Sequence, residues 1–227
     1  MKKILIITAF LGLVILAGLY AKQNLHQVTS TVENPTNQRN DINKEFREGD
    51  LIFQTSLSSQ SQAIQLATKS KYSHCAIILK KEGDNQNWYV FEAVNTIKWT
   101  PLYQWIARGK NSHFVVKRLK NADKVLTNKV LTKIKKIVEQ WNGKKYDLAF
   151  EWSDSKIYCS ELIWKIYQRT TNITIGKLEK LKDFDFTNPV VKAKLKERYG
   201  NDLPLNEIVI SPKAIFDSEL LMTVQIN

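Results

Sequence analysis

The stretch from Tyr158 to Tyr167 constrains the fold more than any other part of this sequence. Apolar side chains recur in it at helical spacing, which predicts a helix with one buried face: Leu162, Ile163, Ile166 and Tyr167. Cys159 stands where this helix is expected to begin, after residues 153–155 that commonly cap helices. A thiol in the first turn meets the positive end of the helix dipole and unpaired backbone N–H groups, which favour the thiolate. The stretch therefore predicts either an activated nucleophile or a small buried thiol that only packs.

Two β-rich runs earlier in the chain bring a histidine and a carboxylate together. Residues 72–79 and 88–94 flank a hydrophilic turn around Gly83, which is typical of an antiparallel hairpin. Pairing about this turn makes His74 and Glu92 direct or near neighbours on one face of the sheet. A register shift of one residue would put them on opposite faces, and each alone is also typical of a half-buried histidine or a strand-end charge. Together they predict a general base beside the group that orients it.

The chain has two cysteines, Cys75 and Cys159, and their pairing decides whether a nucleophile is available. In an exported protein two cysteines often form one disulfide, and such a bond would consume the reactive thiol. Cys75 follows His74 on a predicted strand and is expected to point to the opposite face. We therefore expect no bridge if Cys159 faces His74.

The sequence gives little support to metal or cofactor chemistry. Of its three histidines, His26 lies in a polar stretch and His113 at a predicted strand end, so neither is assigned a role. The spaced metal-binding motifs Cys-x-x-Cys and His-Glu-x-x-His do not occur in it. We expect neither a metal site nor a cofactor.

Residues 1–21 have the composition of an export signal. Lys2 and Lys3 precede an uncharged apolar run at 4–20, and the alternatives are cleavage after Ala21 or an uncleaved membrane anchor. Residues 22–44 are polar and are predicted to form a flexible linker, so the folded domain is expected to occupy 45–227. Either alternative places that domain outside the cytoplasm, in the periplasm or an equivalent compartment.

The formal net charge of +12 narrows the choice of partners. An excess of positive charge suits anionic partners such as a phospholipid surface or a cell-wall polymer, although lysine-rich helix faces are also often simply solvated. No aromatic-basic motif typical of nucleic-acid recognition is present. We therefore expect a peptide-, cell-wall- or lipid-type substrate, a possible anionic membrane surface as partner, and no nucleic acid.

The order of the predicted elements indicates an α+β fold. Strands are expected in hairpins with helices before and after them, and strand and helix do not alternate regularly. The longest amphipathic helix is predicted over 123–141, with apolar residues on one face and lysines opposite. We therefore expect an antiparallel sheet with helices packed around it.

Three side chains fill the roles of a nucleophilic catalytic site. Cys159 is the candidate nucleophile, His74 the candidate base, and Glu92 the group that fixes the tautomer of the imidazole. The backbone N–H of Cys159 is expected to donate to the oxyanion of an acyl-transfer intermediate, because amides at a helix start are unpaired. The second donor is left open, and Gln54 and Tyr158 are the polar side chains to examine.

Four segments resemble the characteristic sequence motifs of the NlpC/P60 papain-like cell-wall amidases: Gly49–Phe53, His74–Ile77, Phe91–Ala93 and Cys159–Leu162. Their order is rotated so that the cysteine helix comes last, which resembles the circularly permuted branch, the YiiX/YaeF-like family. The resemblance spans nearly the whole chain after the N-terminal segment. It implies a permuted papain-like fold, a Cys-His-Glu site and amidase or related hydrolase activity through an acyl-enzyme.

The resemblance does not name the substrate, so three functions stay open. The first is a cysteine amidase or peptidase acting on peptide or cell-wall amides. The second is a lipid-acyl hydrolase or acyltransferase with the same triad, because related permuted enzymes include lipid acyltransferases and thioesterases. The third is a ligand-binding module without turnover. A long apolar groove beside Cys159 would favour the second and a polar cleft the first, whereas an unreactive Cys159 thiol would favour the third.

Overall fold

The computed structural model describes residues 46–227, and the predicted export segment and linker lie outside the described residues. Its larger sheet has six antiparallel strands in the order β4 (Ile97–Pro101), β3 (Asp84–Ala93), β2 (His74–Lys81), β1 (Leu51–Gln54), β5 (Val115–Leu119) and β8 (Leu221–Ile226). A smaller sheet pairs β6 (Glu179–Lys180) with β7 (Ile208–Val209). Within this part of the chain no helix has the length and apolar character needed to cross a membrane.

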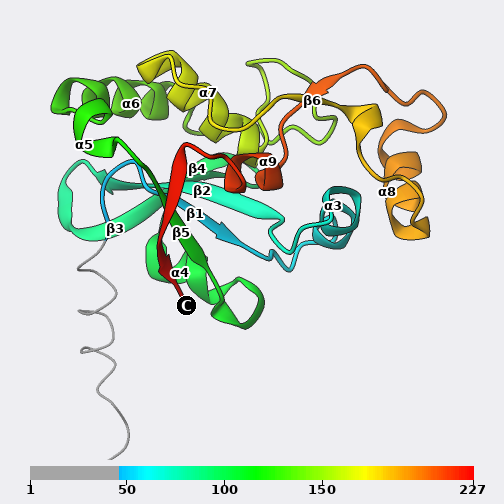
Figure 1. The fold of residues 1–227 in the computed structure, drawn as a ribbon, viewed down its shortest axis with the longest axis horizontal. Helices are drawn as coiled ribbons and strands as arrows, with labels where there is room; N and C mark the ends of the chain where they lie inside the picture. The colour runs from blue at the N-terminus through cyan, green and yellow to red at the C-terminus, as the bar shows by residue number, and fades with distance from the viewer. Residues whose placement is uncertain (1–45) are drawn as a thin grey trace, which may run out of the picture. The chain divides into compact units, whose positions relative to one another are not determined.

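Helices cover the larger sheet on both faces (Figure 1). On one face lie α6 (Asn128–Trp141) and α7 (Cys159–Thr171), and against the other lies the short α4 (Leu102–Ala107). At one end of the sheet α3 (Ser61–Thr68) contacts α8 (Pro189–Tyr199). The remaining helical segments are short: α5 (Ala122–Val125), α9 (Pro212–Phe216), and the 3-10 turns η1 (Lys110–Ser112) and η2 (Leu181–Asp183). The α+β class and the antiparallel sheet predicted from the sequence are confirmed.

Strand β2 supplies alternate residues to the two faces of the sheet. Cys75, Ile77 and Leu79 belong to the main apolar core together with the inner face of α7. His74 and Ala76, which alternate with them, therefore face the α4 side. The apolar residues predicted for the buried face of α7 are all fully buried: Leu162, Ile163, Ile166 and Tyr167. Because each large buried side chain contributes roughly 1.5–3 kcal/mol, this face holds α7, and with it Cys159, firmly on the sheet.

The helix predicted over 123–141 is instead two helices, and the prediction was wrong at this point. α5 ends at Val125 and α6 begins at Asn128. Between them Thr127 has an extended backbone, and its side chain accepts a hydrogen bond from the backbone N–H of Val130. Such an N-cap starts a new helix. The sequence did not reveal the break because apolar residues continue across it.

Candidate active site

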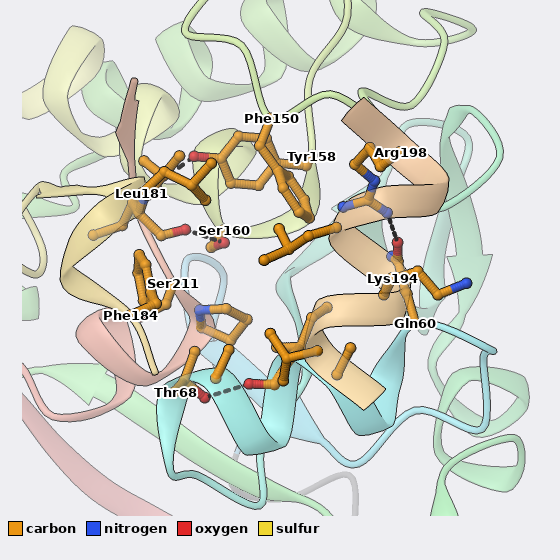
Figure 2. Close-up of a pocket in the computed structure, with 18 of the residues that line it drawn as sticks. Gln60, Thr68, Phe150, Tyr158, Ser160, Leu181, Phe184, Lys194, Arg198 and Ser211 are labelled. Carbon is orange, nitrogen blue, oxygen red and sulfur yellow. Dashed lines mark hydrogen bonds between the residues drawn. The ribbon is translucent and has the colours of Figure 1, made fainter. Parts of the chain in front are cut away.

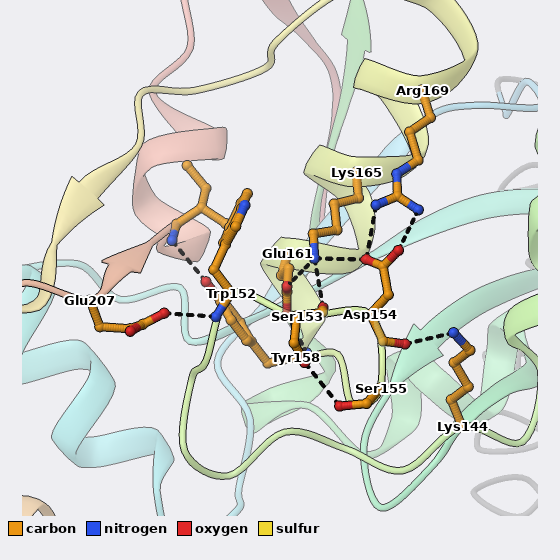
Figure 3. A network of polar contacts seen from close by, with 11 residues as sticks. Lys144, Trp152, Ser153, Asp154, Ser155, Tyr158, Glu161, Lys165, Arg169 and Glu207 are labelled. Atoms are coloured by element: carbon orange, nitrogen blue, oxygen red, sulfur yellow. Dashed lines mark hydrogen bonds and ion pairs between the residues drawn. The ribbon is translucent and has the colours of Figure 1, made fainter. Parts of the chain in front are cut away.

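A network of charged side chains holds the start of α7 (Figure 3). Lys165 Nζ lies 2.7 Å from Glu161 Oε1 and 3.0 Å from Asp154 Oδ1. Glu161 in turn accepts the backbone N–H of Tyr158. The cation thus joins the loop before the helix to the first two turns of the helix. These contacts fix the position of Cys159, which is the first residue of α7.

His74 and Glu92 are in direct contact. Ile77 pairs with Phe91, and this register places Glu92 opposite Ala76, one step diagonally from His74 on the same face. His74 Nε2 lies 2.8 Å from Glu92 Oε2, and both side chains are buried. The hairpin therefore orients the imidazole through its Nε2 atom.

Further donors surround the Glu92 carboxylate. Thr100 Oγ1 donates to Oε1 at 2.6 Å, Trp105 Nε1 donates to Oε2 at 3.0 Å, and Arg108 donates to the same Oε2. Burial would raise the pKa of Glu92, but the hydrogen bond and charge of His74, the charge of Arg108 and the Thr100 bond outweigh burial and set the pKa at about 2. Glu92 is therefore ionised at any pH at which the protein is expected to work.

The thiol of Cys159 and the imidazole of His74 form a charged pair. Burial lowers the pKa of His74, but hydrogen bonds and charges from Cys159 and Glu92 overcome burial and raise it to about 9. Hydrogen bonding from Cys75 and the hydrogen bond and charge of His74 hold the pKa of Cys159 well below its usual value, against burial. Because Nε2 is bonded to Glu92, Nδ1 is the ring nitrogen left for the sulfur. At neutral pH the pair is a thiolate and an imidazolium.

Cys75 points to the face of the sheet opposite to His74, as predicted, and it nevertheless lies beside Cys159. Cys75 does occupy the sheet face opposite to His74, in the core beneath α7. However, α7 begins beside the first residues of β2, so Cys159 meets residues from both faces. The thiol and the backbone N–H of Cys75 both bond to the sulfur of Cys159. Burial and the neighbouring sulfur raise the pKa of Cys75 well above its usual value, so its thiol stays protonated. Both cysteines are free, with no disulfide between them.

A pocket lined mainly by apolar side chains opens beside Cys159 (Figure 2). The volume of the pocket is about 100 Å³. The apolar lining comes from α3, from the loop before α7 and from the segments that lead into and form α8: Ala63, Ile64, Phe150, Leu181, Phe184 and Val191. Lys194 and Arg198 of α8 are its basic side chains, and none of the described residues that line it is acidic. The candidate site therefore combines a thiolate with a pocket of mainly apolar lining.

The two candidates for the second oxyanion donor lie near the site in different ways. Gln54 ends β1 directly opposite His74, but it is not among the residues that line the pocket. Its buried Oε1 lies close to Gly109 and finds no hydrogen-bond partner within residues 46–227. Tyr158 does line the pocket, and its hydroxyl accepts the backbone N–H of Ile210 at 2.9 Å. Tyr158 thus forms part of the pocket wall and is bonded to Ile210, the residue that follows β7.

Sequence reasoning missed two polar residues near the nucleophile, Tyr146 and Gln60. Both line the pocket with Cys159, and Gln60 Nε2 donates to Tyr146 Oη at 3.0 Å. Burial, and after it the charge of Cys159, raise the pKa of Tyr146 well above its usual value, so its hydroxyl keeps its proton. No motif marks either residue, because they are 86 positions apart in the chain.

Residues 45–225 match the model of a family described as permuted papain-like amidase enzymes, YaeF/YiiX, C92 family. The chain belongs to this family. The relationship inferred from four short segments is confirmed, and with it the permuted papain-like fold. Members of this family are cysteine hydrolases of the amidase type, which agrees with the thiolate found at the start of α7.

Two relatives from Escherichia coli support this assignment. The chain is 48% identical over 176 residues to YiiX of strain K12, which covers 78% of this chain and 84% of that protein. The crystal structure of YiiX from E. coli O157:H7, described as a metalloprotein, has 47% sequence identity and a TM-score of 0.75. That comparison covers 81% of this chain and 98% of the other. The similarity thus extends over almost the whole of the relative and includes the strands and helix that carry the site.

Proposed function

We propose that the chain is an exported cysteine amide hydrolase in which Cys159 is the nucleophile, His74 the acid–base group and Glu92 the group that holds the imidazole. One observation carries the proposal: a histidine bonded to a buried carboxylate at 2.8 Å also contacts a cysteine at a helix start. In this arrangement the thiolate exists before substrate binds, so the attack on a carbonyl needs no prior proton transfer.

The proposed reaction has two halves. The thiolate of Cys159 attacks the carbonyl carbon, and the resulting oxyanion accepts hydrogen bonds from the backbone N–H of Cys159 and the hydroxyl of Tyr146. His74 gives its Nδ1 proton to the amine as the C–N bond breaks, which leaves a thioester and a neutral imidazole. His74 then takes a proton from water, and the oxygen attacks the thioester. The carboxylic product leaves, and the thiolate and imidazolium form again.

An apolar acyl group is the substrate feature that the pocket favours. Burying apolar surface contributes roughly 25 cal/mol per Å², whereas a polar peptide backbone would leave its amides without partners among these side chains. The pocket thus supports an N-acyl amide more than a polar cell-wall peptide. The same observation keeps hydrolysis or transfer of a lipid acyl group as a second candidate function.

The E. coli relative described as a metalloprotein raises the question of a metal in this chain. Within residues 46–227 no three or more His, Cys, Asp or Glu side chains are grouped so that they could hold a metal ion. The described residues therefore do not fit a metal site, and the proposed steps use only groups of this chain and water.

The proposed setting is outside the cytoplasm and close to an anionic surface. Export rests on the charged and apolar composition of residues 1–21. Beside the pocket, α8 carries several cations that would attract an anionic lipid surface or cell-wall polymer: Lys192, Lys194, Lys196 and Arg198. Fractionation of cells tests the first part, and sedimentation with phosphatidylglycerol vesicles at low and high salt tests the second.

Two measurements on the purified protein test the proposed function. Iodoacetamide at pH 7 is expected to alkylate Cys159 far faster than an ordinary thiol, and peptide mapping should find the adduct there and not on Cys75. The p-nitroanilide of octanoic acid is expected to be cleaved with a kcat/KM at least tenfold above that of the acetyl compound. Six additional methylene groups could supply up to about 5 kcal/mol if all were buried, at ~0.8 kcal/mol each.

Matched variants separate catalysis from folding. Cys159→Ala should abolish cleavage while the protein stays folded. Cys75→Ala, which removes one hydrogen bond to the thiolate, should lower the rate of cleavage without abolishing it. Cleavage by Cys159→Ala at the wild-type rate would reject the mechanism. If the wild-type Cys159 reacts no faster than free cysteine, the thiol is not activated and the binding-module alternative is favoured.

A further inference from the structure

Three side chains form a hydrogen-bonded chain along one wall of the pocket. Arg198 of α8 donates from Nη2 to Gln60 Oε1 at 2.8 Å (Figure 2). Gln60, which precedes α3, donates from Nε2 to Tyr146 Oη at 3.0 Å. Arg198 is itself held against the ring of Phe150, with Cζ 4.4 Å from the ring centroid. These hydrogen bonds thus link a fixed cation on α8 to a hydroxyl group beside Cys159.

The direction of these hydrogen bonds follows from the chemistry of the groups. A guanidinium only donates, so the Gln60 amide must turn its oxygen toward Arg198. The NH₂ group of Gln60 must then face Tyr146, and because NH₂ cannot accept, the tyrosine oxygen is the acceptor. The single proton of Tyr146 is therefore not used in this chain. It remains available to donate to another acceptor in the pocket that Tyr146 shares with Cys159.

We propose that Arg198 and Gln60 are positioning residues that direct the Tyr146 proton toward the oxyanion formed on the carbonyl attacked by Cys159. Neither residue touches the reacting atoms. Arg198 fixes the orientation of the Gln60 amide. Gln60 donates a hydrogen bond to the tyrosine oxygen from the side away from the substrate. The inference rests on the proposed function, because it requires an acyl-transfer step at Cys159.

The substitution Gln60→Glu reverses the direction of the hydrogen bond between residue 60 and Tyr146. It is compared with Gln60→Met in the full-length protein. A carboxylate accepts from both neighbours, so it keeps Arg198 as an ion pair but draws the Tyr146 proton away from the oxyanion. Methionine removes both hydrogen bonds and leaves the hydroxyl free to rotate. A purely structural role predicts that Gln60→Glu is the milder change, whereas our proposal predicts the opposite order.

The readout is the rate of acylation by p-nitrophenyl octanoate, measured as the burst of p-nitrophenol, divided by the rate of alkylation by iodoacetamide. Alkylation has no oxyanion, so the ratio removes effects on the thiolate itself. Loss of one oxyanion donor costs about 10²–10³-fold in rate. We expect Gln60→Glu to lower the ratio by about 10²-fold and Gln60→Met by about tenfold or less. Arg198→Met, which frees the Gln60 amide to turn over, should fall between wild type and Gln60→Glu.

The variant Tyr146→Phe provides the control. In that background Gln60→Glu should change the ratio by less than about twofold, because the proton that it redirects is absent. A wild-type ratio in Gln60→Glu, or an equal loss in the Tyr146→Phe background, would overturn the positioning role. The proposed function fails separately, when the wild-type protein shows no burst and no adduct on Cys159.

Discussion

The substitution Glu92→Gln removes the charge behind His74 and keeps the shape of the side chain. In the wild type His74, Trp105 and Arg108 all bond to Oε2, whereas Thr100 bonds to Oε1. A glutamine must therefore turn its carbonyl oxygen toward the cluster of donors and its NH₂ group toward the Thr100 hydroxyl, which also accepts. His74 keeps a hydrogen bond but loses its anionic partner.

The size of the effect follows from the difference between charged and neutral hydrogen bonds. A bond to a charged group contributes about 1.5–3 kcal/mol and a neutral one about 0.5–1.5 kcal/mol, so the loss is about 1–1.5 kcal/mol. Since one pKa unit corresponds to about 1.36 kcal/mol, the pKa of His74 should fall by about one unit from its value of about 9. The imidazolium that is proposed to protonate the leaving amine is then lost at a lower pH.

The assay is kcat/KM for the octanoyl p-nitroanilide between pH 6 and pH 10. We expect kcat/KM to fall on the alkaline side of the profile with a midpoint near pH 9 in the wild type and about one pH unit lower in Glu92→Gln. At neutral pH, Glu92→Gln should lose less activity than His74→Ala. Arg108→Met should move the alkaline midpoint upward, because Glu92 then loses a competing cation and its charge acts on His74 more fully. The reasoning is refuted if Glu92→Gln leaves the alkaline midpoint in place, or if both variants move it in the same direction.

Three other perturbations test the pocket and the supporting charges. Ile64→Ser, which places a hydroxyl in the apolar wall, should lower kcat/KM for the octanoyl p-nitroanilide by about 5–30-fold and leave the acetyl compound nearly unchanged. Burial raises the pKa of Glu161 from 4.5 to about 7 despite Lys165, so the folded state binds the proton more tightly than the unfolded state. The free energy of unfolding should therefore fall by up to about 3 kcal/mol as the pH rises from 4.5 to 7, and urea titrations of Glu161→Gln should show this dependence removed. Arg118 donates to both oxygens of the fully buried Asp50 at 2.7 Å, so Arg118→Met should cost about 3–5 kcal/mol in urea unfolding, and a loss below 1 kcal/mol would contradict this role.

The parts of the fold that the sequence could predict are those in which one local pattern decides the outcome. Helical spacing identified the buried face of α7, and two apolar runs about a polar turn identified the hairpin of β2 and β3. His74 and Glu92 stood out because each interrupts an apolar strand at matching distances from the turn. The break at Thr127 was missed because a capping side chain leaves no trace in the hydrophobic pattern.

The surroundings of the nucleophile could not be predicted from the sequence, because they depend on where α7 lies relative to the sheet. Alternation along β2 correctly separates His74 from Cys75, yet Cys159 contacts both because its helix begins beside the first residues of the strand. Likewise the bond from Arg198 to Gln60 joins segments 138 residues apart. No spacing rule connects positions that meet only through tertiary packing.

The line of charges at the site explains how a thiolate can exist beside an apolar pocket. Arg108, Glu92, His74 and Cys159 follow one another with alternating sign, so the set is neutral as a whole. An isolated buried ion costs several kcal/mol, and each charge here has a neighbour of opposite sign within bonding distance. The charges that compensate the thiolate lie behind His74, toward α4. The side of the sulfur that faces the pocket therefore needs no cation. The apolar lining can therefore extend up to Cys159, as the proposed attack on the carbonyl carbon of an apolar acyl group requires.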